Sequence, residues 1–349
     1  MTRALDSLFD GMNDVDRTIG LRVCEERSVE AGDVVLRAGE PARGLLCVLD
    51  GKFDVRSGSS VVGRVGPGDL VGEMALFQEA ARTASVVATT PGRILVLPRQ
   101  GYERLRDVMH PLAVAVEQHA IDLQSNRLRS VSDRIARLAE ECPMPFSRPS
   151  ERFFASLKSL FGLGGVSVAA QIDAIGALAR SSIFADAPRE ALGAVARHFR
   201  PAAYDAGHLL CIEGEMGQAM YILAKGEVDV VVATAENQVK ELARLRLDAV
   251  FGMLSLAQDR PRMATCVART SVVTLVLDQG RWDDLVSEPG LAGSTFRRAL
   301  LRSLNDQLAY ANKRLARYEA LARDDSDLLL AGAGVDTHPA SLPPSEDEP

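Results

Sequence analysis

Short apolar runs separated by turn residues fill the part of the chain from Val34 to Leu97. The separators are Ala-Gly-Glu-Pro, Asp-Gly, Ser-Gly-Ser and Gly-Pro-Gly-Asp, which are typical of hairpins and tight loops. The runs predict strands at 34–37, 45–49, 52–56, 61–65, 83–88 and 93–97. Many short strands joined by glycine-rich turns indicate a double-layer jelly roll or a small barrel.

The pattern of the first half returns in the second half. Residues 51–55 (Gly-Lys-Phe-Asp-Val) recur 175 residues later as 226–230 (Gly-Glu-Val-Asp-Val). Farther along, the pair Gly72 and Arg82 recurs with an offset of 180, so five extra residues lie near 233–241. Self-similarity of this kind indicates two copies of one domain. The extra residues are polar, and we expect them in a surface hairpin loop.

A long amphipathic helix is predicted after each set of strands. Its stripe has alternating spacings of three and four, the a/d pattern of a helix that pairs with another helix. The stripes consist of Ile121, Gln124, Leu128, Val131, Ile135 and Leu138, and of Leu301, Leu304, Leu308, Ala311, Leu315 and Tyr318. From the second stripe we predict a homodimer seam formed by Leu301, Leu304, Leu308, Leu315 and Tyr318. Pairing within one chain or between chains stays open, and packing of each stripe on its own roll is the alternative.

We expect the chain of 349 residues to divide into four parts. Residues 1–141 form the first domain with its long helix, and 142–165 form a Pro-containing linker with a short amphipathic segment. Residues 166–323 form the second domain with its heptad helix. Residues 324–349, rich in Pro, Ser and acid, form a disordered tail.

The net charge of -7 is concentrated in that tail, which holds seven acidic residues and neither Lys nor Arg. The remainder of the chain is neutral, which argues against non-specific binding to nucleic acid. No apolar run is long enough to cross a membrane, and the first residues lack the pattern of a secretory signal. We therefore expect a cytoplasmic protein.

The five cysteines are scattered singly, without a C-x-x-C pair. This spacing argues against a metal site or a disulfide framework, and we interpret the cysteines as small buried hydrophobic residues. The five histidines form no cluster either, so we expect no metal. Neither a nucleophile–base motif nor a phosphate-binding glycine loop of the Walker type is present, which argues against an enzyme.

The segment from Gly66 to Val86 has the chemistry of a phosphate site. Gly72 would let the main chain approach a ligand, and a short helix from Glu73 would point the amides of Ala75 and Leu76 inward. Arg82 can make a two-pronged contact with a phosphate diester. Glu73 is an acceptor suited to a ribose hydroxyl.

This segment resembles the phosphate-binding cassette of the cyclic-nucleotide-binding domain family, written F-G-E-[LIVM]-A-L followed by R-[TAS]-A. The matching residues, which are the predicted ligand-binding set, are Gly72, Glu73, Met74, Ala75, Leu76, Arg82, Thr83 and Ala84. The resemblance implies an α+β fold of two β-rolls (jelly rolls), each with flanking N-terminal helices and a long C-terminal helix. It also implies that Glu73 binds the ribose 2′-hydroxyl, that Arg82 binds the cyclic phosphate, and that the ligand repositions the long helix.

The second copy departs from the family at the acid, where Met253 stands. Methionine accepts no strong hydrogen bond, and the loss of a charge-assisted bond costs about 1.5–3 kcal/mol. We expect a degenerate or differently tuned pocket there. Its candidate residues are Gly252, Leu254, Ser255, Arg262 and Met263.

Two classes of function follow. The first is a regulator that senses a cyclic nucleotide in its first domain and controls an unidentified protein partner. Cyclic AMP and cyclic GMP both stay open, and we favour cyclic AMP. The second is a dimeric scaffold with vestigial pockets that acts without a ligand. Direct DNA binding is not expected, because only the acidic tail follows the second long helix and no basic recognition helix remains.

Overall fold

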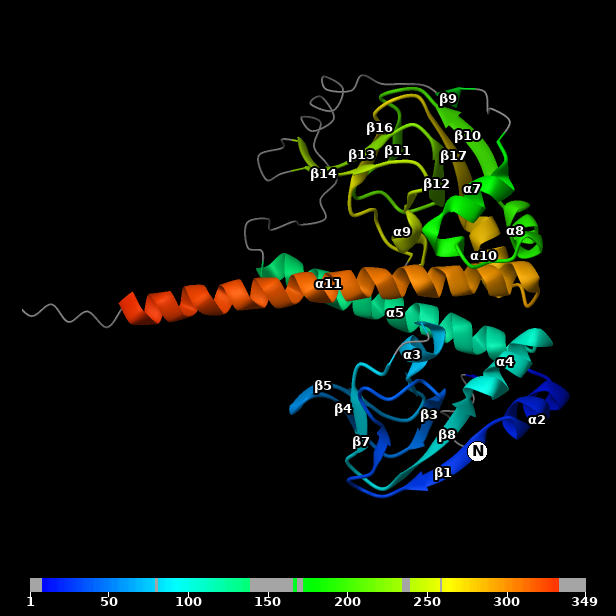
Figure 1. Cartoon of the computed structure of the whole chain (residues 1–349), viewed down its shortest axis with the longest axis vertical. Coiled ribbons are helices and arrows are strands. Elements are labelled where there is room, and N and C mark those ends of the chain that lie inside the picture. The colour runs from blue at the N-terminus through cyan, green and yellow to red at the C-terminus, as the bar shows by residue number, and fades with distance from the viewer. Residues whose placement is uncertain are drawn as a thin grey trace, which may run out of the picture.

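Two β-rolls lie on opposite sides of a pair of long helices (Figure 1). The structure is a computed structural model that describes residues 8–78, 81–138, 166–167, 172–233, 239–257 and 259–332. The expected fold class, two antiparallel rolls with flanking helices, is confirmed. The predicted linker at 142–165 lies outside the described residues.

The first roll consists of two antiparallel sheets that face each other. In sheet order they are β1 (Glu25–Val29), β8 (Gly92–Pro98), β3 (Gly44–Asp50) and β6 (Leu70–Val71), and β2 (Val34–Leu36), β7 (Ser85–Ala88), β4 (Phe53–Ser57) and β5 (Ser60–Val65). The six predicted strands are present. The pattern missed β1, because four of its five residues are exposed, and β6, because it has only two residues.

The second roll repeats this topology and adds one strand. Its sheets are β15 (Val250–Phe251), β12 (Ala219–Lys225), β17 (Val272–Asp278), β10 (Arg200–Tyr204) and β9 (Val166–Ser167), and β11 (Leu209–Cys211), β16 (Thr265–Ala268), β13 (Val228–Ala233) and β14 (Val239–Leu245). The predicted insertion falls between β13 and β14, which form a hairpin.

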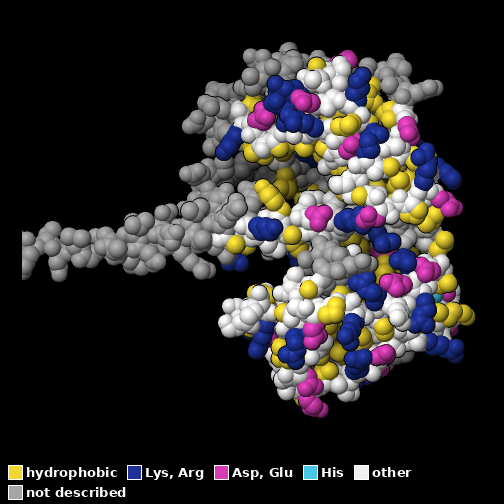
Figure 2. Space-filling view, viewed as in Figure 1, with side chains coloured by type: hydrophobic (Ala, Val, Ile, Leu, Met, Phe, Trp, Pro, Cys, Tyr) yellow, Lys and Arg dark blue, Asp and Glu magenta, His cyan; other side chains and the backbone are white. Residues whose placement is uncertain are grey.

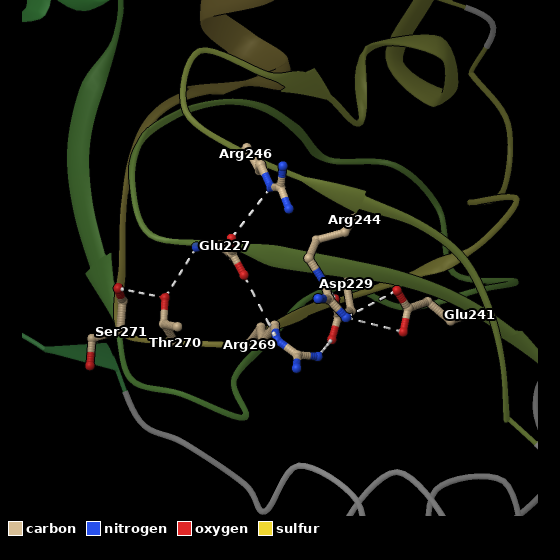
Figure 3. A network of polar contacts seen from close by, with 8 residues as sticks. All are labelled: Glu227, Asp229, Glu241, Arg244, Arg246, Arg269, Thr270 and Ser271. Atoms are coloured by element: carbon tan, nitrogen blue, oxygen red, sulfur yellow. Dashed lines mark hydrogen bonds and ion pairs between the residues drawn. The ribbon is translucent and has the colours of Figure 1, made fainter.

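A polar network holds the outer strands of the second roll (Figure 3). Asp229, whose side chain is fully buried, accepts from Arg244 at 2.8 Å and from Arg269 at 3.0 Å. Asp229 and Arg244 are direct cross-strand partners, as are Asp54 and Arg64 in the first roll. The repeat therefore preserves a charged pair that fixes the hairpin register, since opposite charges on facing residues favour that pairing.

Helices cover one end of each roll. The first half has α2 (Asp14–Arg22), α3 (Glu73–Gln78), α4 (Arg99–Asp107) and α5 (Pro111–Leu138). The second half has α7 (Ala174–Arg180), the 3-10 turn η1 (Ser182–Phe184), α8 (Arg189–Ala196), α9 (Met253–Ala257), α10 (Gln279–Ser287) and α11 (Leu291–Gly332). The helix α11 continues beyond residue 323, where we expected the tail to begin. Among the described residues, no helix is both long and apolar enough to cross a bilayer.

The two long helices pair with each other inside one chain and run in the same direction (Figure 1). Ile121 and Leu128 of α5 share a buried cluster with Leu301, Leu304 and Leu308 of α11. The seam therefore joins the two halves of the chain as the protomers of a symmetric dimer would be joined. Leu315 is buried as well, whereas the side chain of Tyr318 lies outside the described part.

This pairing changes the meaning of the predicted homodimer seam. Its residues Leu301, Leu304 and Leu308 are covered by α5 of the same chain. A homodimer through them stays a prediction that would require the chains to exchange their long helices.

A buried ion pair lies on this interface. Arg297 Nε donates to Glu117 Oε2 at 2.6 Å, and both side chains are 1% exposed. Tyr102 donates to the other oxygen of Glu117, and Arg297 also donates to the carbonyls of Val286 and Glu288. Burial raises the pKa of Glu117, and the guanidinium of Arg297 opposes that shift. Positions 117 and 297 are equivalent in the repeat. Pairing α5 with α11 therefore brings opposite charges together, whereas pairing either helix with a second copy of itself would bring like charges together.

We predict that Arg297→Met lowers the free energy of unfolding by about 3–5 kcal/mol, because the substitution leaves a buried carboxylate without its cation. The double variant Glu117→Gln with Arg297→Met should lose less, because neither charge remains. Denaturant unfolding of the single and double variants measures this difference. Strictly additive losses would contradict the assigned pairing.

Candidate functional site

A cavity of about 70 Å³, open to solvent, lies in the first roll. Its lining includes apolar residues from the strands: Leu36, Val55, Val71 and Val86. The remaining lining residues are Gly72, Glu73, Arg82, Thr83, Ala84 and Arg127. Five of the eight residues predicted from the cassette thus line a single cavity.

The other three predicted residues belong to α3. Leu76 is 3% exposed and packs in the core of the roll, and its amide lies 3.4 Å from the carbonyl of Gly72. The sequence predicts that this amide points at a ligand; in this structure it donates within the first turn of α3, and contact with a ligand stays a prediction. The side chains of Met74 and Ala75 lie outside the described part.

Gly72 is required by its surroundings. Its φ is +93°, and a Cβ at this position would lie 2.4 Å from Nη1 of Arg82. An L side chain would therefore be strained by its backbone and would also displace the guanidinium. The glycine lets Arg82 lie against the main chain at the start of α3.

Arg82 is held by the main chain on both sides. Its side chain donates to the carbonyl of Gly44 at 2.6 Å and to that of Gly72 at 3.3 Å. Arg82 is 9% exposed. Burial lowers its pKa, and the negative charge of Glu73 partly opposes this effect. The side chain thus presents a positioned cation to the cavity that it lines.

Glu73 connects α3 to the long helix α5. Its side chain is buried, and its Oε1 accepts from Gln124 Nε2 at 2.8 Å and from Arg127 Nη1 at 2.5 Å. Both of these bonds end on the same oxygen. The carbonyl oxygen of the Gln124 amide is buried and finds no partner within the described part of the chain.

The sequence pattern places Gln124 in the helix seam, and it does not identify Arg127 as a residue of the site. The three-residue spacing of Gln124 and Arg127 places both on one face of a helix. That spacing could have identified the pair, had the carboxylate they face been known.

The second roll keeps the arginine and its two main-chain bonds. Arg262 donates to the carbonyls of Gly252 at 2.6 Å and Ala219 at 2.5 Å. Ala219 and Gly252 are the repeat equivalents of Gly44 and Gly72. This contact is therefore part of the fold of both rolls, whether or not a ligand binds.

The acid and its amide partner are both replaced in the second roll. Met253 stands in place of Glu73, and Leu304 stands in place of Gln124. Both side chains are buried in the cluster that joins the long helices. At both of these positions an apolar side chain thus replaces the polar one of the first roll.

The residues predicted for the second pocket fall into two groups. Arg262 and Ser255 are buried, and both lie next to Gly217. Leu254 and Met263 line an apolar groove between the second roll and the long helices. Within the described residues, no three His, Cys, Asp or Glu side chains are grouped as a metal would require.

Known proteins resemble this chain over most of its described length. The sequence model of the family described as "Cyclic nucleotide-binding domain" matches residues 26–108 and 201–288. The cGMP-dependent protein kinase egl-4 of Caenorhabditis briggsae is 24% identical over 265 residues, which are 75% of this chain and 28% of the kinase. The cAMP-dependent protein kinase regulatory subunit of Aspergillus niger is 28% identical over 280 residues, 76% of this chain and 53% of that subunit.

One similar solved structure is the regulatory domain of Toxoplasma gondii PKA with cAMP. It is 19% identical, the match covers 89% of this chain and 94% of that one, and the TM-score is 0.32. The present chain spans about a quarter of the matched kinases and about half of the fungal regulatory subunit.

We predict that Gln124→Leu destabilises the first roll by about 1.5–3 kcal/mol, because it removes a hydrogen bond to a buried carboxylate. The double variant Glu73→Met with Gln124→Leu reproduces the pair found in the second roll and should recover most of that loss. Chemical unfolding monitored by circular dichroism measures both. A double variant less stable than Gln124→Leu would show that the two rolls are not equivalent here.

Proposed function

Given that the chain carries two cyclic nucleotide-binding domains, we propose that it is a regulatory protein whose first roll binds one cyclic nucleotide and signals through α5 to a protein partner. The observation that carries the proposal is the cavity lined by Glu73, Arg82 and Arg127. An anion-binding guanidinium and a hydroxyl-binding carboxylate face one small space there. These are the two groups that a ribose cyclic phosphate needs.

Each end of the ligand has a matching group in this proposal. The guanidinium of Arg82 offers the cyclic phosphate those N–H groups that its two carbonyl bonds do not use. Glu73 offers an oxygen to the ribose 2′-hydroxyl, while its Oε1 stays bonded to α5. The ligand and α5 would then share the carboxylate of Glu73. Ligand binding would therefore change how strongly Glu73 holds Gln124 and Arg127, and with them the position of α5.

The route beyond α5 is short. The helix α3, which carries Glu73, also contacts α11, and α9 of the second roll contacts α5. Phe77 of α3 packs edge-on against Tyr102 at a centroid distance of 5.4 Å, and Tyr102 donates to Glu117. A ligand that biases α3 or α5 therefore acts on packed elements of both halves of the chain.

We favour cyclic AMP over cyclic GMP as the ligand. The unpaired amide oxygen of Gln124 is an acceptor close to Glu73. Adenine carries a donor amino group at its sixth position, where guanine carries an acceptor oxygen. If that oxygen meets the sixth position of the base, it accepts a hydrogen bond from adenine and none from guanine.

In this proposal the second roll supports the structure. Met253 cannot bind a ribose hydroxyl, and the main-chain bonds of Arg262 give that arginine a role without a ligand. The partner is a protein and not DNA. On the face in Figure 2 basic and acidic side chains are interspersed over both rolls, unlike the basic surface that nucleic acid requires.

One observation favours the alternative of a scaffold that needs no ligand. Glu73 is bonded to Gln124 and Arg127, and Arg82 is bonded to two carbonyls. The charged groups of the first site are thus stabilised within the protein itself. Such a site could persist after its ligand had been lost.

Calorimetric titration with cyclic AMP and with cyclic GMP tests the proposal. We expect one nucleotide per chain, with cyclic AMP bound more tightly, and a Glu73→Gln variant weakened by about 10–100-fold through loss of a charge-assisted bond. Absence of heat with both nucleotides would refute the sensor and leave the scaffold.

The matched pair of arginine variants separates ligand binding from folding. Arg82→Ala and Arg262→Ala each lose the same two carbonyl bonds, so both should lower the melting temperature to a similar extent. Only Arg82→Ala should abolish nucleotide binding. Equal loss of binding in both variants would show that the effect comes from the fold.

Hydrogen exchange tests the coupling to α5. In the wild type we expect nucleotide to increase the protection of amides in 111–138. In Arg127→Met, which removes an ion pair between Glu73 and the helix, the nucleotide should still bind while that increase becomes smaller. An identical increase in both proteins would contradict the assigned role of Arg127.

A further inference from the structure

Two thiols face each other inside the second roll. Cys211 on β11 and Cys266 on β16 are direct partners in the antiparallel register. Their side chains are 5% and 6% exposed, and both cysteines are free. Directly opposed residues of antiparallel strands have Cα atoms about 4.5–5.5 Å apart and side chains on the same face. Disulfides span about 4.4–6.8 Å between Cα atoms, a range that includes the spacing of such pairs. The register shifts between Leu209 and Cys211, just before the pair.

The pair occupies the place where the first roll has its cavity. The equivalent residues are Leu36 and Val86, which are also direct partners across β2 and β7. Both line the cavity of the first roll. The second roll therefore has two thiols where the first roll has two apolar wall residues, and it lacks the acid that would serve a nucleotide.

The surroundings of the pair favour one reactive sulfur. The two thiols are close enough to change each other's pKa, and the charge of Arg262 acts on both. The interaction with Cys266 lowers the pKa of Cys211, whereas the pKa of Cys266 is raised well above its ordinary value. In the first roll, burial raises the pKa of Cys24 to about 12 and that of Cys47 to about 11. Thiolate is the reactive form, so Cys211 is the more reactive sulfur in this comparison.

We propose that Cys211 and Cys266 form a peroxide-oxidisable dithiol, which makes the second roll a redox-responsive module. The Cys211 thiolate attacks one oxygen of hydrogen peroxide, the O–O bond breaks, and with one proton the products are a sulfenic acid and water. The thiol of Cys266 then attacks the sulfenic sulfur, the S–O bond breaks, and the hydroxyl leaves as a second water. The two sulfurs lose two electrons in total, and peroxide takes them up. A thiol reductant reverses the reaction.

The disulfide would link the segment that contains Arg262 to the neighbouring segment that follows Cys211. Just beyond Cys211, Gly214 N donates to the carbonyl of Arg262, and Arg262 N donates to the carbonyl of Glu215. Oxidation would thus lock the part of the roll that holds Arg262 against Gly252 and Ala219. This site is independent of nucleotide binding in the first roll.

The test exposes the folded full chain to a modest excess of hydrogen peroxide and then denatures it in the presence of an alkylating agent. We expect two fewer free thiols than the five of the reduced chain and a mass lower by about 2 Da before alkylation. Peptide mapping should find Cys211 linked to Cys266, and dithiothreitol should restore both thiols.

Matched variants are available from the repeat itself. Cys211→Leu and Cys266→Val introduce the residues of the first roll, and each should abolish the linked peptide while the chain stays folded. Cys47→Ile introduces the residue of the second roll at the equivalent position and should leave the link intact. Formation of the Cys211–Cys266 link in wild type and Cys47→Ile alone supports the proposal. Five intact thiols, oxidation to sulfinic acid without a link, or a link through other cysteines would each overturn it.

Discussion

The pairing of α5 with α11 is the contact that the rest of the molecule depends on. A stripe of leucines supplies its apolar area, and the buried pair of Glu117 and Arg297 supplies its specificity. A buried ion pair contributes little net stability, but it disfavours any arrangement that leaves one charge alone. Like-with-like pairing of two α11 helices would place arginine against arginine. The interface therefore favours the pairing of the two unlike long helices, which join the two rolls within this chain.

The comparison of the two rolls separates folding from ligand recognition. Both arginines, Arg82 and Arg262, bind two carbonyl groups of their own roll, so the arginine is part of the architecture. The rolls differ at two other positions. The first roll has Glu73 and Gln124 there, and the second roll has Met253 and Leu304. An acid buried against a long helix needs an amide or a cation beside it, whereas a methionine needs an apolar neighbour. The acid of the cassette, with its helix partners, is thus the better indicator of a ligand site.

The same logic explains how one fold can carry two kinds of chemistry. Each roll has an interior region that is lined by residues from two neighbouring strands of one sheet. Valine and leucine there leave an apolar wall beside the polar site of the first roll. At the same positions the second roll has two cysteines that are register partners, and the charge of Arg262 acts on both. The scaffold is unchanged, and a few side chains decide what it can react with.

The sequence by itself determined the two-fold repeat, most strands, the long helices and the cassette around Glu73 and Arg82. These features are encoded locally, by turn residues, by alternation and by spacings of three and four. The short strand β6 and the exposed strand β1 were missed, because their pairing depends on strands far away in the chain. Only the tertiary structure decided that the two seams meet within one chain, that Arg127 reaches Glu73, and that Cys211 faces Cys266. Each of these contacts joins residues more than fifty positions apart, and a one-dimensional pattern contains no distance between such residues until the backbone has folded.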